Sequence, residues 1–123
     1  MANTSNAGTG LVTISQLMYV GSLTDTQCVG VGAVNCTNHD SFVFTQQVQF
    51  GNGTLSVEQP TTLGSPTAAQ STTGTVSTNP VTDGGAKLAT TQQAAMQALW
   101  QVTTNGRTHL VDGQIMYVAE VYF

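Results

Sequence analysis

The sequence predicts a mainly β protein of one domain: an antiparallel β-sandwich or barrel-like sheet with one short α-helix and a C-terminal β-meander. Runs of β-branched and aromatic residues recur along the chain, turn-forming glycines and asparagines separate them, and one segment has helical composition. With 123 residues, a single domain spanning 1–123 can remove about two thirds of its unfolded surface from water. The chain is therefore long enough for a sizeable core.

The first predicted strand covers residues 11–20, LVTISQLMYV, with Val12 and Ile14 on one face. A polar segment at residues 1–10 precedes it and is expected to be an extended arm. Residues 21–40 are rich in Gly, Asn and Asp, which indicates a looping region. That region contains both cysteines of the chain.

Residues 41–58 are predicted to form a β-hairpin. The first arm, SFVFTQQVQF, alternates in polarity, GNG supplies the turn, and TLSVEQP returns. Alternation predicts that one face of the first arm is apolar, with Gln46 as the exception: Phe42, Phe44, Val48 and Phe50.

The segment 60–85, PTTLGSPTAAQSTTGTVSTNPVTDGG, has no apolar rhythm and one charge, Asp83. A long segment without regular structure is usually functional, disordered or a linker, and the chain has no second domain for it to join. We expect this loop or arm to lie extended across a neighbouring copy and to become ordered on assembly.

Helix-forming residues in KLATTQQAAMQAL predict one amphipathic helix at about 91–100, capped by Thr90 or Thr91. Its apolar stripe at helical spacing, flanked by Met96 and Trp100, comprises Ala95, Leu99 and Val102.

Two turn dipeptides favoured in type I′ turns, Asn105-Gly106 and Asp112-Gly113, predict a meander with strands near 100–104, 107–111 and 114–123. The last strand is the longest and most apolar, so we expect it to be buried in the domain's own sheet or against a neighbour. The residues of this expected assembly strand are Ile115, Tyr117, Val118, Val121, Tyr122 and Phe123.

Cys28 and Cys36 enclose a short loop with two glycines that permits a disulfide. Such a crosslink would stabilise the fold by roughly 2–3 kcal/mol and would indicate an oxidising environment. Two free buried thiols are the alternative. A second alternative is a metal site formed by the two cysteines with His39 and Asp40, but the spacing C-x7-C-x2-H-D matches no established zinc site. The favoured interpretation is a disulfide with no metal.

No catalytic constellation or cofactor motif is evident. His39 and His109 have ordinary structural explanations, and the six acidic residues mostly belong to turns and strand edges. Glu120 lies within the last strand and is expected on its solvent side; if buried, it would need Lys87 or Arg107 as a partner. The sequence therefore favours a protein that is not an enzyme.

Charged residues make up 7% of the chain and the net charge is −4, against about 25% charged residues in average soluble domains. With only two strong cations, the chain cannot neutralise a run of phosphates, which argues against nucleic acid and anionic membranes as partners. No apolar stretch is long enough for membrane insertion. Natural monomers protect strand edges with lysines and other charges, so this chain is expected to use its edges in assembly.

These observations predict a non-enzymatic, self-assembling structural protein whose partners are copies of itself or a fellow component of the same particle or filament. The absence of a signal peptide after Met1 favours a virion protein, such as a capsid decoration or tail protein, over an extracellular filament or pilus subunit. A carbohydrate-binding or adhesive β-sandwich is the other alternative, with Trp100 or the tyrosines Tyr19, Tyr117 and Tyr122 stacking on sugars. Sequons at Asn3, Asn35 and Asn52 are weak signals of glycosylation.

Overall fold

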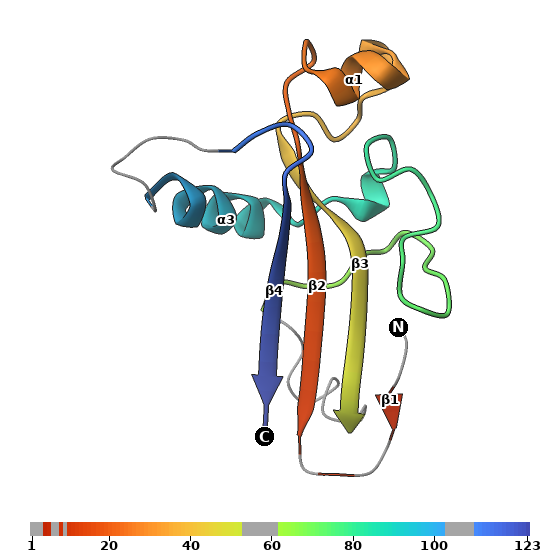
Figure 1. Cartoon of the computed structure of the whole chain (residues 1–123), viewed down its shortest axis with the longest axis vertical. Helices are drawn as coiled ribbons and strands as arrows, with labels where there is room; N and C mark the ends of the chain where they lie inside the picture. Colours follow the sequence, from red (N-terminus) through yellow and green to blue (C-terminus); the bar gives the residue numbers. More distant parts are fainter. Residues whose placement is uncertain (1–3, 6–7, 9, 53–61, 103–109) are drawn as a thin grey trace.

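The computed structural model describes residues 4–5, 8, 10–52, 62–102 and 110–123. Three long antiparallel strands form an open sheet, and a two-residue strand pairs in parallel with one of its edges (Figure 1). In chain order the strands are β1 (Thr4–Ser5), β2 (Leu11–Val20), β3 (Ser41–Asn52) and β4 (Ile115–Tyr122). The order across the sheet is β1-β3-β2-β4. The mainly β class is confirmed, whereas neither a sandwich nor a barrel forms within the described residues.

The helical elements are short apart from one. They are α1 (Thr26–Val31), the 3-10 turns η1 (Ala33–Asn35) and η2 (Gly84–Ala86), and α3 (Thr90–Val102). The helix predicted at 91–100 is confirmed as α3. The region 21–40, which was expected only to loop, contains α1 and η1.

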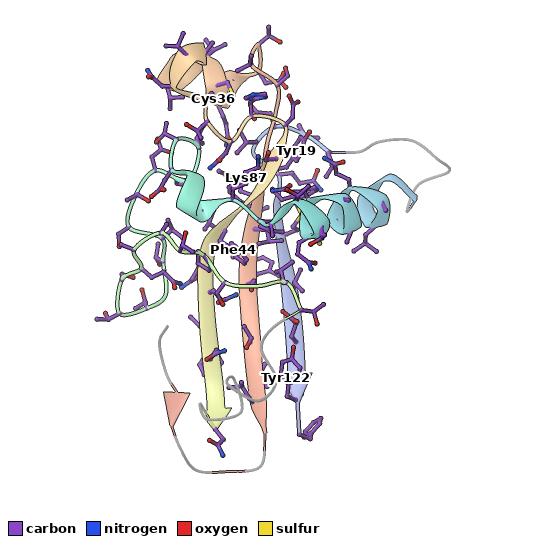
Figure 2. The ribbon with its side chains drawn as sticks, turned by 180° about the vertical axis from the view of Figure 1, so that it is seen from behind. Tyr19, Cys36, Phe44, Lys87 and Tyr122 are labelled. Carbon is purple, nitrogen blue, oxygen red and sulfur yellow. A yellow bond between two sulfur atoms is a disulfide. The ribbon has the colours of Figure 1, made fainter. Side chains whose placement is uncertain are left out.

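The helix α3 crosses one face of the sheet, called here the covered face (Figure 2). The segment 62–88 packs partly on that face and partly along the free edge of β3, where Thr75 bridges to Gln46 and Lys87 to Val43. The hydrophobic core lies between that face and these two segments. Its larger members are Leu17, Phe42, Phe44, Leu63, Val76, Val81, Leu88, Met96 and Met116. The molecule therefore has two layers, a sheet and an irregular layer that contains α3.

A β-bulge at Thr45 reverses the faces of β3. Gln16 pairs with Gln46, but Leu17 pairs with Phe44, so Thr45 is an extra residue on β3. Because side chains alternate along a strand, one extra residue exchanges the two faces. The predicted apolar face of β3 is therefore wrong: Phe42 and Phe44 share the covered face with Gln47 and Gln49, and Val48 and Phe50 lie on the opposite face. Val12 and Ile14 share a face as predicted.

Residues 62–85 pack on the chain's own sheet. The N–H of Val76 donates to Thr45 O at 2.9 Å, and the N–H of Gln47 donates to Gly74 O at 3.0 Å. Leu63, Val76 and Val81 are buried. The expectation that this segment lacks a packing face and becomes ordered only on a neighbouring copy is therefore wrong for residues 62–85.

Of the predicted C-terminal meander, the structure contains the last strand, β4. Residues 100–102, which were predicted as the start of a strand, belong to α3, and residues 103–109 lie outside the described residues, as does the returning arm of the 41–58 hairpin. The turn at Asp112-Gly113 forms, with the N–H of Gln114 donating to Val111 O at 2.9 Å. Only Gly113 of the pair has a positive φ, so the turn is not type I′.

Candidate assembly surface

Strand β4 divides the predicted assembly residues between the two faces of the sheet. Ile115, Tyr117 and Val121 are 45%, 68% and 51% exposed and share one face by strand alternation. Phe123, directly after the strand, is 89% exposed. The structure therefore brings three large apolar side chains of β4 together on a surface open to solvent.

The exposed face of β4 continues across β2 and β3. Val12 pairs with Val121 on one side and with Phe50 on the other, and Ile14 pairs in the same way with Ala119 and Val48. Figure 1 looks onto this face, with α3 behind the sheet and most of segment 62–88 beside β3. We call it the bare face and define it by Val12, Ile14, Gln16, Gln46, Val48, Phe50, Ile115, Tyr117, Ala119 and Val121. None of these side chains is charged.

The polar side chains of the bare face have partners within the chain. Gln16 Nε2 donates to Tyr117 Oη at 2.7 Å, and the Thr45 hydroxyl donates to Gln16 Oε1 at 2.8 Å. Gln46 Nε2 donates to Thr73 O at 2.8 Å. Because these amides are already hydrogen-bonded within the chain, the surface that the bare face offers to a partner is mainly apolar.

The other assembly residues of β4, Val118 and Tyr122, alternate onto the covered face with Glu120. The Glu120 carboxylate Oε2 accepts from Thr62 N–H at 2.6 Å and from the Tyr122 hydroxyl at 3.1 Å, and its Oε1 is buried without a hydrogen bond. The expectation that Glu120 faces solvent is wrong, because the register pairs it with buried Thr13. The one charge of β4 is thus directed away from the bare face.

Cys28 and Cys36 form a disulfide, as predicted. It joins α1 to the end of η1, and both side chains are buried; Figure 2 labels Cys36 beside this loop, beyond one end of the sheet. The paired sulfurs leave neither free thiols nor metal ligands at this position. Because disulfides persist in oxidising compartments, the bond indicates a non-reducing, extracellular-type environment.

The acidic groups near this end of the sheet have structural partners. Asp112 accepts from the N–H groups of Gly21 and Gln27, both at 2.9 Å. Burial raises the pKa of the Tyr19 hydroxyl, and the negative charges of Asp40, Asp25 and Asp112 raise it further. Asp112 therefore holds the 21–40 region on the turn before β4, and the three carboxylates favour the neutral form of Tyr19.

The other sequence candidates are dispersed. His39 Nδ1 lies 3.0 Å from Asp40 Oδ2 at an exposed position. The sequon residue Asn35 is exposed and its amide donates to Val31 O at 3.0 Å, and the Asn52 amide donates to Gly8 O at 3.0 Å. His109 and Asn3 lie outside the described residues. Within the described ranges there is no cavity and no cluster of three or more potential metal ligands.

None of the helices described is both long and apolar enough to cross a lipid bilayer. No protein-family model, curated protein or solved structure matches this chain.

The last strand was singled out from the sequence as an assembly strand, but the extent of the bare face could not be predicted. The contribution of β4 was visible in its alternation. The contribution of β3 was hidden by the bulge, because Val48 and Phe50 join the bare face only after the register shift between Gln16 and Leu17. A pair of adjacent glutamines, Gln46 and Gln47, was the only local sign that the alternation changes there.

Proposed function

We propose that this protein is a structural component that associates with copies of itself through the bare face. The observation that carries the proposal is an apolar, charge-free sheet face whose side chains Ile115, Tyr117, Val121 and Phe50 are 42–68% exposed. Three strands of about eight residues outline an area of about 400 Å². An apolar patch of this size matches the largest patch on a typical soluble protein, and such patches are often functional.

A second copy fits this face better than other partners. Two bare faces bring no charges into contact, and their large side chains can interdigitate as those of two stacked sheets do, about 10 Å apart. The second sheet of the β-sandwich expected from the sequence would then come from another copy. A nucleic acid or an anionic membrane would require cations, which the bare face lacks.

Among self-associating structural proteins, our first candidate is a component of a virus particle, such as a capsid decoration or tail protein. An extracellular filament or pilus subunit is the second. Both classes need copies that cover one another's apolar surfaces, and both work where the Cys28–Cys36 bond remains oxidised. Negative-stain images of the assembled protein would separate them, since rings or shells support the particle and fibres support the filament.

Carbohydrate binding is a separate candidate, favoured by one observation. Tyr117 is 68% exposed on a flat surface and its hydroxyl is held by Gln16 at 2.7 Å, an arrangement on which a sugar ring could stack. Selective binding on a glycan array that is lost in Tyr117→Ala, by a protein that remains monomeric, would favour this candidate over assembly.

Size-exclusion chromatography with light scattering tests self-association. The wild-type chain is expected to form oligomers as its concentration rises, and Val121→Lys is expected to form smaller ones, because it places a charge within the bare face. Ala94→Lys is the matched control, since Ala94 is exposed on α3, which lies on the other side of the sheet. A wild-type chain that stays monomeric at every concentration would overturn the proposal.

A further inference from the structure

Among the described residues, none pairs with the outer edge of β4, which is open in this part of the structure. β4 pairs with β2 on one side, and no described element pairs with it on the other. Natural proteins usually block such an edge with Lys, Pro or a bulge. Ile115–Tyr122 contains neither Lys nor Pro, its register with β2 is unbroken, and its one carboxylate is turned toward Thr62. Nothing in the strand itself blocks the addition of another strand.

The direction of the main-chain groups of β4 follows from its ladder with β2. The Tyr19 N–H donates to Gln114 O at 2.9 Å, and alternate residues of an antiparallel strand bond to the same neighbour. Met116, Val118, Glu120 and Tyr122 therefore bond to β2. The residues that direct their N–H and C=O groups to the open edge are Ile115, Tyr117, Ala119 and Val121.

The space beside β4 in the plane of the sheet is not occupied by any described residue. Both views show α3 crossing the covered side and projecting past β4 (Figure 1, Figure 2). Leu99, in the second half of α3, is 56% exposed. A strand added to β4 would thus extend the sheet beneath the projecting part of α3, which would lie on its covered side.

We propose that β4 pairs antiparallel with β4 of a second copy about a two-fold axis at Val118. This inference deepens the proposed function and rests on it. In this register the two strands overlap along their full length, with Tyr117 opposite Ala119 of the second copy and Ile115 opposite Val121. Each Glu120 faces Met116, so the two carboxylates stay apart.

Two observations favour this register over its neighbours. The four outward residues pair with one another and form about eight main-chain hydrogen bonds, close to the roughly ten of a typical protein interface. A register shifted toward the C-terminus would instead bring the two Glu120 side chains together, and like charges opposite one another in a sheet are unfavourable.

Edge pairing provides a contact that the bare face does not. An isologous contact uses the same patch on both copies, so packing of two bare faces closes at a dimer. A second isologous contact at the β4 edge allows each dimer to join further copies. The chain then has the two contacts that a ring, shell or filament needs.

Single cysteine variants test the pairing. In the proposed dimer the two copies of residue 118 lie about 4.5 Å apart at the Cα atoms, within reach of a disulfide, whereas the two copies of residue 121 are about 20 Å apart. After mild oxidation, Val118→Cys is expected to run as a crosslinked dimer on a non-reducing gel and Val121→Cys as a monomer.

The alternative outcomes separate this inference from the proposed function. Crosslinking of Val121→Cys without Val118→Cys would show that bare faces meet and would overturn the edge pairing alone. Oligomers in light scattering, with no crosslinking of either variant, would also overturn the edge pairing alone. A chain that is monomeric in light scattering and crosslinks at neither position overturns both.

A proline variant tests the role of the main chain. Ala119→Pro removes an outward N–H from an edge strand, a position where proline is tolerated, so the variant is expected to keep its circular dichroism spectrum. In the Val118→Cys background it should abolish crosslinking, and Ala119→Thr, which retains the N–H, should not. Persistence of the crosslink in the proline variant would overturn the inference.

Discussion

Gln93 of α3 and Phe42 of β3 exchange two hydrogen bonds. The Phe42 N–H donates to Gln93 Oε1 at 2.7 Å, and Gln93 Nε2 donates to Phe42 O at 2.8 Å. The same Nε2 donates to Leu88 O at 3.2 Å. The side-chain amide thus pairs with β3 as the peptide group of a neighbouring strand would, and it fixes the start of α3 on the sheet.

Gln93→Leu is expected to lower the free energy of unfolding by about 2–4 kcal/mol, because it leaves the buried Phe42 N–H without an acceptor. Gln93→Glu keeps the acceptor but turns a buried carboxylate oxygen toward the carbonyl oxygens of Phe42 and Leu88, so it should also be destabilising at neutral pH. Urea unfolding followed by circular dichroism measures both variants. A Gln93→Leu variant as stable as the wild type would show that the pair contributes nothing.

The Cys28–Cys36 bond closes a short loop and stabilises the fold mainly by restricting the unfolded chain. The double variant Cys28→Ala/Cys36→Ala is expected to lose about 2–3 kcal/mol of unfolding free energy. Reductant should lower the urea midpoint of the wild type and leave that of the double variant unchanged. Equal midpoints for the wild type with and without reductant, once reduction is verified by thiol counting, would contradict this prediction.

The sequence predicts the elements whose periodicity is local. The strand expected at 11–20 is β2, the strand expected at 114–123 contains β4, and the helix expected at 91–100 lies within α3. Each of these segments has a composition that specifies its backbone without reference to the rest of the chain.

The choice of buried face depends on partners distant in sequence. Gln47 Nε2 donates to Ser15 Oγ at 3.0 Å and Gln49 Nε2 to Thr13 Oγ1 at 3.1 Å, which allows two glutamines to be buried where their own strand gives no sign of it. The bulge at Thr45 that turns them inward has no local sign beyond the adjacent glutamines Gln46 and Gln47. Polarity alone therefore assigned the faces of β3 incorrectly.

The buried side of α3 also depends on partners distant in sequence. The predicted apolar stripe includes Ala95 and Leu99, yet both are exposed, and the helix buries Gln93 and Met96 instead. Hydrogen bonding to β3 selects the buried side of this helix. The exposed stripe of α3 is thus a second apolar surface, in addition to the bare face.

Asp112 connects the turn before β4 to the start of the 21–40 region through the N–H groups of Gly21 and Gln27. Asp112→Ala leaves both donors without this acceptor and is expected to lower the unfolding free energy by about 1–3 kcal/mol. Asp112→Asn retains one acceptor oxygen and should cost less. Hydrogen exchange should accelerate at Gly21 and Gln27 in the alanine variant; unchanged exchange at both amides would argue against this link.

The hydrogen bonds of Asp83 predict the direction in which stability changes with pH. A hydrogen bond from the Thr78 hydroxyl at 2.6 Å, and then one from the Gly85 N–H at 2.8 Å, lower the pKa of this carboxyl below its ordinary value. A lowered folded-state pKa gives a contribution to stability that is present above the unfolded-state pKa and lost as pH falls through the folded-state value.

The Asp83 pKa is measured from its carboxyl carbon chemical shift as a function of pH. Thr78→Val removes the larger cause, so it should raise the pKa toward the ordinary value. It should also weaken the loss of stability in acid. The prediction is wrong if Asp83 titrates in the folded wild type at the same pH as in the unfolded chain.

Gly74 lies where segment 62–85 contacts β3. It has a φ of 85°, and a Cβ at this position would collide with the main chain of Gln47. Its carbonyl oxygen accepts from the Gln47 N–H at 3.0 Å and from Gln70 Nε2 at 2.6 Å. Gly74→Ala should therefore be destabilising by more than the roughly 1–3 kcal/mol of a strained backbone, because the segment must also move away from β3.

Gly64→Ala is the matched control, since Gly64 has a φ of 87° but open space at its Cβ position. The difference between the two variants in unfolding free energy isolates the contact with Gln47 from the strain of a positive φ. Hydrogen exchange at the Gln47 and Val76 amides should accelerate in Gly74→Ala and change less in Gly64→Ala. Equal effects would mean that the turn at Gly74 does not hold the segment on the sheet, and that another contact, such as that of Thr62 with Glu120, does.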